Sequence, residues 1–372
     1  MADTQDLQVR SSRPARLLQR AFTTVLLVGM AVAVMMFVRG QDWSVLATEM
    51  RSRPPGSFAL LVGLALLANA VAVLAALLAW WSMLSAVNAD VAPTAEGGGL
   101  TAVGAARIFF VGQFAKYMPG KVFGFVLSVK MGRAMGIPAA RTATAWLLTL
   151  VIGLLTAASA GLVAGPQVLG GSEAWLAAAS AVPLAVILLR PQLVNEAATV
   201  VARLRRRPPP AITLPGRVIR RNVVIQMLSW LFGGIQLWCL AIALGAPPAR
   251  SLPLCVGAFA LGAAAGVFAV FTPDGLGVRE VILLSALGAV LPLPAAGVVA
   301  VISRLVVAVS ELITAGLGLA VTEVLRRRAG APAAPVRAAR IRDKIRPSSG
   351  QLGSPPLHRQ LLTTEKTNSE EQ

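Results

Sequence analysis

The chain has 372 residues, of which 56% are hydrophobic and only 13% are charged, and its mean hydropathy is +0.72. A composition this apolar excludes an ordinary soluble domain and indicates a polytopic membrane protein. The formal net charge is +18, but the basic residues form short clusters between apolar runs. This distribution is typical of cytosolic loops that face anionic lipid, so we expect no nucleic-acid partner.

The residue types that carry metal, cofactor or nucleophilic chemistry are scarce in this sequence. Both cysteines, Cys239 and Cys255, lie in apolar runs, and the single histidine, His358, lies in a polar tail. The sequence contains no His/Cys cluster and no glycine-rich phosphate-binding motif. We therefore predict no metal site, no cofactor and no catalytic residues, which favours a protein that is not an enzyme.

The first half begins with a basic segment, residues 1–20, which we expect in the cytosol. Region 101–136 contains two short apolar stretches on either side of Pro119 and Gly120, and basic residues follow it. Because each stretch is short for a crossing, we predict a re-entrant hairpin that enters from the cytosolic side and turns at this break. Four full spans are predicted around this hairpin, at residues 21–38, 57–87, 142–164 and 174–189.

The second half starts after the most basic loop, residues 190–221, which we expect in the cytosol. Two more full spans are predicted at 222–244 and 296–321, with region 252–291 between them. This region is broken at residues 273–277, and we expect it to enter and leave from the outer side. The remainder, residues 326–372, is rich in proline, serine and charge and is predicted to be a disordered basic cytosolic tail.

The two broken regions share a sequence motif that indicates an internal duplication. Residues 112–119 read GQFAKYMP and residues 266–273 read GVFAVFTP. The order span, hairpin, span occurs twice, in halves at about 57–164 and 222–321, and the two copies point in opposite directions. We therefore predict an all-α polytopic fold of about six full spans plus two re-entrant hairpins in an inverted-topology repeat. The alternative is eight or more full spans, and either topology keeps both termini in the cytosol.

The helix breaks also suggest an anion site. A helix that starts after either break would point its N-terminal amides at the cavity, where they favour an anion. Cations within the membrane are costly and usually functional. We predict a midplane site for a phosphate-bearing lipid head group, with substrate-binding residues Tyr117, Lys121, Arg279, Glu280, Arg304 and Glu311. The predicted break residues are Pro119, Gly120, Pro273, Asp274, Gly275 and Gly277.

The same charges also have a purely structural interpretation. Lys116 and Lys121 can extend toward the interface, and Asp274 is more typical of a turn residue than of a proton carrier. Arg304 and Glu311 are seven residues apart and share one helical face, a spacing of two turns that is long for a direct bridge. Each of them is therefore expected to have its partner on another helix.

At the two breaks the sequence resembles the lysylphosphatidylglycerol synthase transmembrane family, also called the flippase-like domain family. The motifs are KYMPGK at residues 116–121 and PDGLGVRE at residues 273–280, followed by Arg304. The resemblance covers about residues 20–325, and Asp274 stands where the family has its first glycine after the proline. We expect a transmembrane domain at 21–325 without the soluble aminoacyl-transfer domain of the full-length synthases.

The resemblance implies a multi-pass protein of the cell (plasma) membrane that works on lipids. It would bind and translocate an anionic phospholipid or a polyprenyl-phosphate-linked head group. The alternative is a membrane subunit or scaffold that presents lipid to a separate glycosyl- or aminoacyl-transferase. An integral-membrane transferase is disfavoured because no acid pair that would activate an acceptor is evident.

Overall fold

A computed structural model describes residues 35, 39, 43–52, 54, 56–89, 101–116, 122–163, 174–196, 199, 213–269, 275 and 277–328. Within these ranges every regular element is a helix, which confirms the all-α prediction. The chain divides into one unit at Met1–Arg328 and a second at Ala329–Gln372. The predicted basic N-terminus, the predicted tail from residue 329 onward and nearly all of the predicted span at 21–38 lie outside the described residues. Residues 326–328, which were predicted to belong to the disordered tail, are instead the end of the last long helix.

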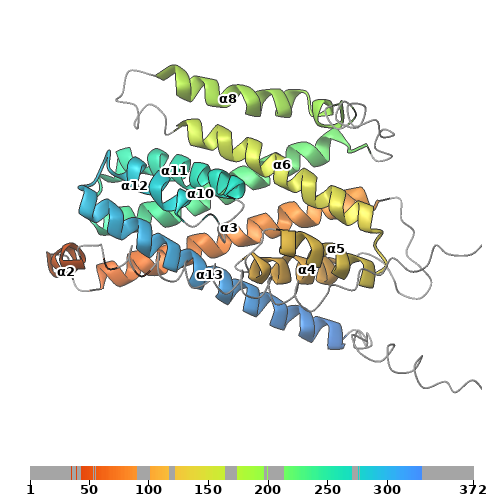
Figure 1. Cartoon of the computed structure of the whole chain (residues 1–372), viewed down its shortest axis with the longest axis horizontal. Coiled ribbons are helices and arrows are strands. Elements are labelled where there is room, and N and C mark those ends of the chain that lie inside the picture. The colour runs from red at the N-terminus through yellow and green to blue at the C-terminus, as the bar shows by residue number, and fades with distance from the viewer. Residues whose placement is uncertain are drawn as a thin grey trace, which may run out of the picture. The chain divides into compact units, whose positions relative to one another are not determined.

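Five helices are long and apolar enough to cross a membrane: α3 (Ser57–Val87), α6 (Ala139–Val163), α10 (Gly216–Ala243), α11 (Pro248–Phe268) and α13 (Leu293–Arg328). The shorter helices are α2 (Trp43–Ser52), α4 (Ala102–Ala115), α5 (Val122–Ala134), α8 (Ala174–Leu189) and α12 (Val278–Leu287). Figure 1 shows how these helices are arranged. Several apolar helices in one chain make this a multi-pass membrane protein.

The candidate spans differ from the predicted set in two places. Helices α3, α6, α10 and α13 correspond to predicted full spans, but α8 has only 16 residues and contains Pro183. At 1.5 Å per residue α8 is about 24 Å long, which is shorter than the ~30 Å hydrocarbon core. Helix α11 has 21 residues, which is long enough to cross. The first arm of the second broken region is therefore longer than the short stretch that the sequence suggested.

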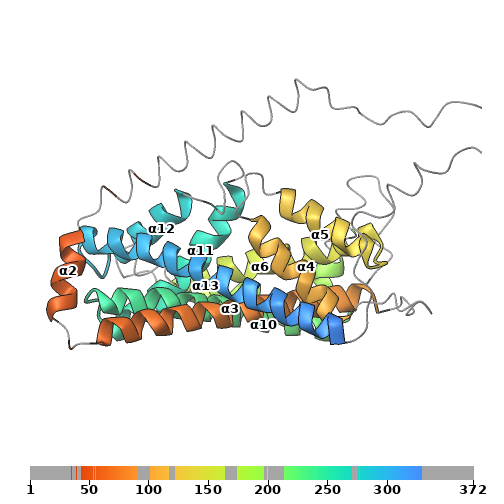
Figure 2. The same cartoon turned by 90° about the horizontal axis from the view of Figure 1, so that it is seen from below.

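The two broken regions lie toward opposite ends of the described helices, as Figures 1 and 2 both show. Helices α4 and α5 lie near the end where α13 finishes, whereas α11 and α12 lie near the end where α13 starts. The arms of the first region have 14 and 13 residues. The arms of the second have 21 and 10 residues. The first broken region thus has two arms of nearly equal length, whereas the arms of the second region differ in length by about a factor of two.

Helices α3 and α10 are held together by side-chain hydrogen bonds to backbone oxygens. Asn222 Nδ2 donates to the Ala79 oxygen at 2.8 Å, and Ser229 Oγ donates to the Ala72 oxygen at 2.9 Å. The two donors are seven residues apart on α10, and the two acceptors are seven residues apart on α3 in the opposite chain direction. This is expected for antiparallel helices that meet every two turns. Buried polar groups of this kind join helices where water is absent. This contact fixes the helix from which the second broken region departs.

Helices α10 and α11 approach each other so closely that only glycine fits at their contact. A Cβ atom at Gly234 would lie 2.3 Å from the Cα of Val256, and one at Gly233 would lie 2.1 Å from the Phe259 ring. Small residues at a helix contact allow backbones to come together, and this packing replaces the missing hydrophobic driving force within lipid. The approach positions α11 and therefore the break that follows it.

The Gly234 contact predicts that G234A destabilises the protein. The obstructing atom belongs to the backbone, so the helices must separate, and we expect a loss of about 1–3 kcal/mol in the free energy of unfolding. The matched control is G316A on α13, because a Cβ there meets no atom within 4 Å. Thermal unfolding of the detergent-purified variants measures both. An unchanged Tm for G234A beside G316A would contradict the close approach.

Candidate functional site

Helix α13 carries two charged residues, Arg304 and Glu311, and each forms an ion pair with one of the two broken regions. Glu311 Oε1 lies 2.6 Å from the Nζ of Lys116, which follows the last residue of α4. Arg304 Nε lies 3.4 Å from Oε1 of Glu280, in the first turn of α12. Arg304 and Glu311 therefore pair with other helices rather than with each other, as their two-turn spacing suggested. Among the described residues, one face of α13 thus forms an ion pair with each of the two broken regions.

Lys116 is positioned by the end of α4. Its backbone N–H donates to the Gly112 oxygen at 3.2 Å, and its ammonium lies at the negative end of the helix dipole, where a cation is favoured. The side chains of Lys116 and Glu311 are 29% and 10% exposed. The pair is therefore partly shielded from solvent, and each charge stabilises the other in its burial.

Glu280 has two roles, because its two carboxylate oxygens have different partners. Oε1 faces Arg304, and Oε2 accepts a hydrogen bond from the Gly277 N–H at 2.6 Å. Gly277 has a φ of 90°, a left-handed conformation that favours glycine. The acid thus caps the start of α12 and joins that helix to α13. The N-terminus of α12, where the sequence predicted an anion, already carries one carboxylate of its own.

Arg279 is directed at the other arm of the same broken region. Its guanidinium carbon lies 4.4 Å from the centre of the Phe259 ring on α11, within the range of a cation–π interaction. The residue is buried, and its Cγ would lie 3.1 Å from a Cβ at Gly262. A glycine at position 262 therefore makes room for the arginine stem. Arg279 binds α12 to α11, whereas its neighbour Glu280 binds α12 to α13.

The glycines of the second motif permit a backbone crossing. Gly275 has a φ of 69°, and a Cβ there would lie 2.4 Å from the Cα of Gly266. The chain therefore returns across α11 at the first glycine of the repeated motif, with no space for a side chain. Pro273 and Asp274 lie outside the described residues, and so do four predicted site residues of the first break, Tyr117, Pro119, Gly120 and Lys121.

Sequence reasoning missed Lys116 as a site residue and treated it as a side chain that extends to the interface. The signal was present in the repeat, because position 116 is lysine in the first copy and valine, Val270, in the second. A charge that appears in only one copy of an apolar motif needs its own partner. Gln236 was missed too: it is fully buried on α10 and accepts a hydrogen bond from Ser303 Oγ at 3.3 Å.

The described site residues have a surplus of one positive charge. Lys116, Arg279 and Arg304 are cationic, and Glu280 and Glu311 are anionic, so three charges oppose two. A net positive charge suits an anion, and an anion that binds Lys116 or Arg304 must compete with the carboxylate already paired there.

Comparison with known families accounts for most of the chain. The family model described as the lysylphosphatidylglycerol synthase TM region matches residues 22–313. The chain belongs to this family. The matched range includes both broken regions and both α13 charges, and the family that the sequence resembled is confirmed. No curated protein matches the chain. This member of the lysylphosphatidylglycerol synthase TM family is thus a membrane-embedded, lipid-related protein.

The Lys116–Glu311 pair predicts that single charge reversals destabilise the protein and that the double reversal restores it. K116E or E311K places like charges together and should cost about 1–3 kcal/mol. The charge-swapped variant K116E/E311K regains the attraction and should recover most of this loss. Thermal unfolding of the three variants forms a double-mutant cycle. Additive losses in the double variant would show that the two side chains do not interact.

Proposed function

We propose that this family member binds the phosphate of an anionic phospholipid or a polyprenyl-phosphate-linked lipid and moves its head group across the membrane. The observation that carries the proposal is that both hairpins are joined by ion pairs to one face of α13. Broken helices with charges at membrane depth are the usual construction of transporter sites. The position of this pairing between the two hairpins favours a site between them.

The ion pairs give a mechanism for coupling head-group binding to hairpin movement. A phosphate that binds Arg304 competes with Glu280, and a phosphate that binds Lys116 competes with Glu311. The distance of 3.4 Å at Arg304 is longer than the 2.6 Å at Lys116, so the Arg304 pair is the easier one to exchange. Because Glu280 also caps α12, its release would loosen the start of that helix and the hairpin with it.

The placement of the hairpins at opposite ends supports alternating access. If the repeats have inverted topology, the first hairpin lines a route from the cytosol and the second lines a route from the outer side. A head group would then exchange between the two pairs along one face of α13, from Arg304 to Lys116 or in reverse. The surplus positive charge matches the negative charge of a phosphodiester. Lys121 would add a second cation at the first break.

Neutralising the site cations should abolish lipid movement. In proteoliposomes that contain fluorescent phosphatidylglycerol, we expect K121Q/R279Q and R304Q to lower the rate of head-group translocation at least about tenfold, since each loses a charge-assisted hydrogen bond. The control is R250Q, because Arg250 is exposed in the first turn of α11. Lipid movement that continues unchanged in K121Q/R279Q would exclude this proposal.

The hairpin topology can be tested independently of activity. In a cysteine-free background, single cysteines at Met118 and Thr272, which lie outside the described residues, mark the two breaks. We expect membrane-impermeant thiol reagents to label both positions slowly, Met118 from the cytosolic side and Thr272 from the outer side. Rapid labelling on opposite faces of the membrane, as in ordinary loops, would make the hairpins full spans. The midplane anion site would then lose its structural basis.

A static interpretation of the ion pairs favours a second function, that of a membrane subunit or scaffold. The Lys116–Glu311 distance of 2.6 Å is that of a strong charge-assisted hydrogen bond, which would fasten the first hairpin permanently. Such a protein would present lipid to a separate glycosyl- or aminoacyl-transferase. Co-purification with a transferase, together with no lipid movement in proteoliposomes, distinguishes this function from transport.

A further inference from the structure

A cavity of ≈ 330 Å³ lies between the last turns of α3 and the first turns of α10. None of the residues of the α13 ion pairs lines it. It is lined by α3 residues between Trp81 and Ala86 and by α10 residues between Arg217 and Arg221. This volume falls at the lower end of the range of about 300–1,000 Å³ typical of small-molecule pockets. The cavity therefore has room for a polar head group.

The two arginines give the cavity a positive charge. Arg217 and Arg221 are one turn apart on the same face of α10. In the part of the chain that the structure describes, neither has a carboxylate partner. Arg220 differs, because its Nε donates to the Leu188 oxygen at 2.8 Å and so joins α10 to α8. The cavity also lies at the positive end of α10, which begins at Gly216.

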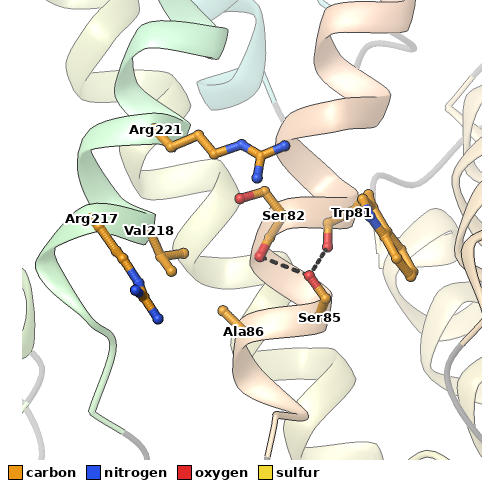
Figure 3. A pocket seen from close by; sticks show the side chains of 7 residues that line it. All are labelled: Trp81, Ser82, Ser85, Ala86, Arg217, Val218 and Arg221. Carbon is orange, nitrogen blue, oxygen red and sulfur yellow. Dashed lines mark hydrogen bonds between the residues drawn. The ribbon is translucent and has the colours of Figure 1, made fainter.

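The hydroxyl groups on α3 complete a set of donors. Ser85 Oγ donates to the Trp81 oxygen at 2.7 Å or to the Ser82 oxygen at 3.2 Å, so its proton is already used within the helix. Among the described residues the Ser82 hydroxyl has no partner. Figure 3 shows Arg221 extending from α10 toward Ser82. Two guanidinium groups and one hydroxyl thus remain as donors, a set that suits the oxygens of a phosphate.

An apolar strip on α3 leads to this cavity. Leu67, Leu74 and Leu78 are 61%, 45% and 50% exposed and share one helical face. The next positions on this face are Trp81 and Ser85. From Leu74 to Ser85 the helix rises about 16 Å, close to half of the ~30 Å hydrocarbon core. An acyl chain beside the leucines would bring its phosphate level with the cavity. Tryptophan at this depth is typical of the membrane interface.

We propose that this cavity is a second lipid site, in which Arg217, Arg221 and Ser82 bind the phosphate of an anionic phospholipid from the surrounding leaflet. The acyl chains lie along the α3 leucines, and the head group bridges α3 and α10. The lipid is held there rather than moved. The site goes beyond the proposed transport function and stands even if the α13 charges serve only to fasten the hairpins. Free phosphate shares the same recognition chemistry, so the test includes it.

Native mass spectrometry of the full-length protein in detergent, titrated with dioleoyl phosphatidylglycerol, measures the binding. We expect R217Q/R221Q to raise the apparent Kd at least about tenfold, and R217K/R221K to raise it less because the charges remain. The matched control is K130Q/R133Q, which removes two exposed charges from α5 outside the cavity and should bind as the wild type does. Dioleoyl phosphatidylcholine, whose head group has no net charge, should bind more weakly than phosphatidylglycerol.

Three results would overturn the proposal. Equal weakening by R217Q/R221Q and K130Q/R133Q would mean that the overall positive charge attracts the lipid and that the cavity does not. If inorganic phosphate at equal concentration displaced phosphatidylglycerol, the cavity would bind a soluble anion equally well. The α3 leucines would then contribute nothing to binding. Wild-type affinity in R217Q/R221Q would exclude the site. Because both arginines are exposed, an unchanged Tm is expected and separates lost binding from lost folding.

Discussion

The structure depends on the pairing of two charges on α13 with the two interrupted regions of the chain. A charged side chain at membrane depth is expensive unless it meets an opposite charge, so Arg304 and Glu311 constrain what can pack against their face. Their partners, Glu280 and Lys116, come from the two different broken regions. Because an unpaired charge there would raise the free energy of the folded state, the ion pairs keep the two breaks beside one helix. The two broken regions thus have a common attachment although they lie toward opposite ends of the described helices.

Close glycine contacts and polar side chains on α3, α10 and α11 also hold the second broken region in place. Gly234 brings α10 against the backbone of α11, and Gly275 brings the returning chain against Gly266. Asn222 and Ser229 bind backbone oxygens of α3, which orients α10. Within lipid, apolar side chains gain little by leaving one apolar surface for another, so close approach and hydrogen bonds decide which helices associate. The second break is consequently held by backbone contacts as well as by charge.

The two candidate lipid sites differ in how their cations are used. Lys116 and Arg304 already have carboxylate partners, so an anion must displace an acid in order to bind them. Arg217 and Arg221 have no such partner in the described part of the chain, and an anion can bind without breaking a contact. A site that exchanges partners suits movement, whereas a site with ready donors suits retention. The presence or absence of a carboxylate partner therefore distinguishes the α13 site from the site between α3 and α10.

The sequence by itself determined the all-helical membrane fold, four of the long helices and the family, because hydropathy and the two break motifs are local properties. It also indicated that Arg304 and Glu311 need partners elsewhere, since helical spacing is fixed at 1.5 Å per residue. Tertiary structure alone decided which partners these are, the length of α11 and the role of Lys116. Ion pairing depends on the distance between side chains that are remote in sequence, and a local sequence pattern does not determine that distance.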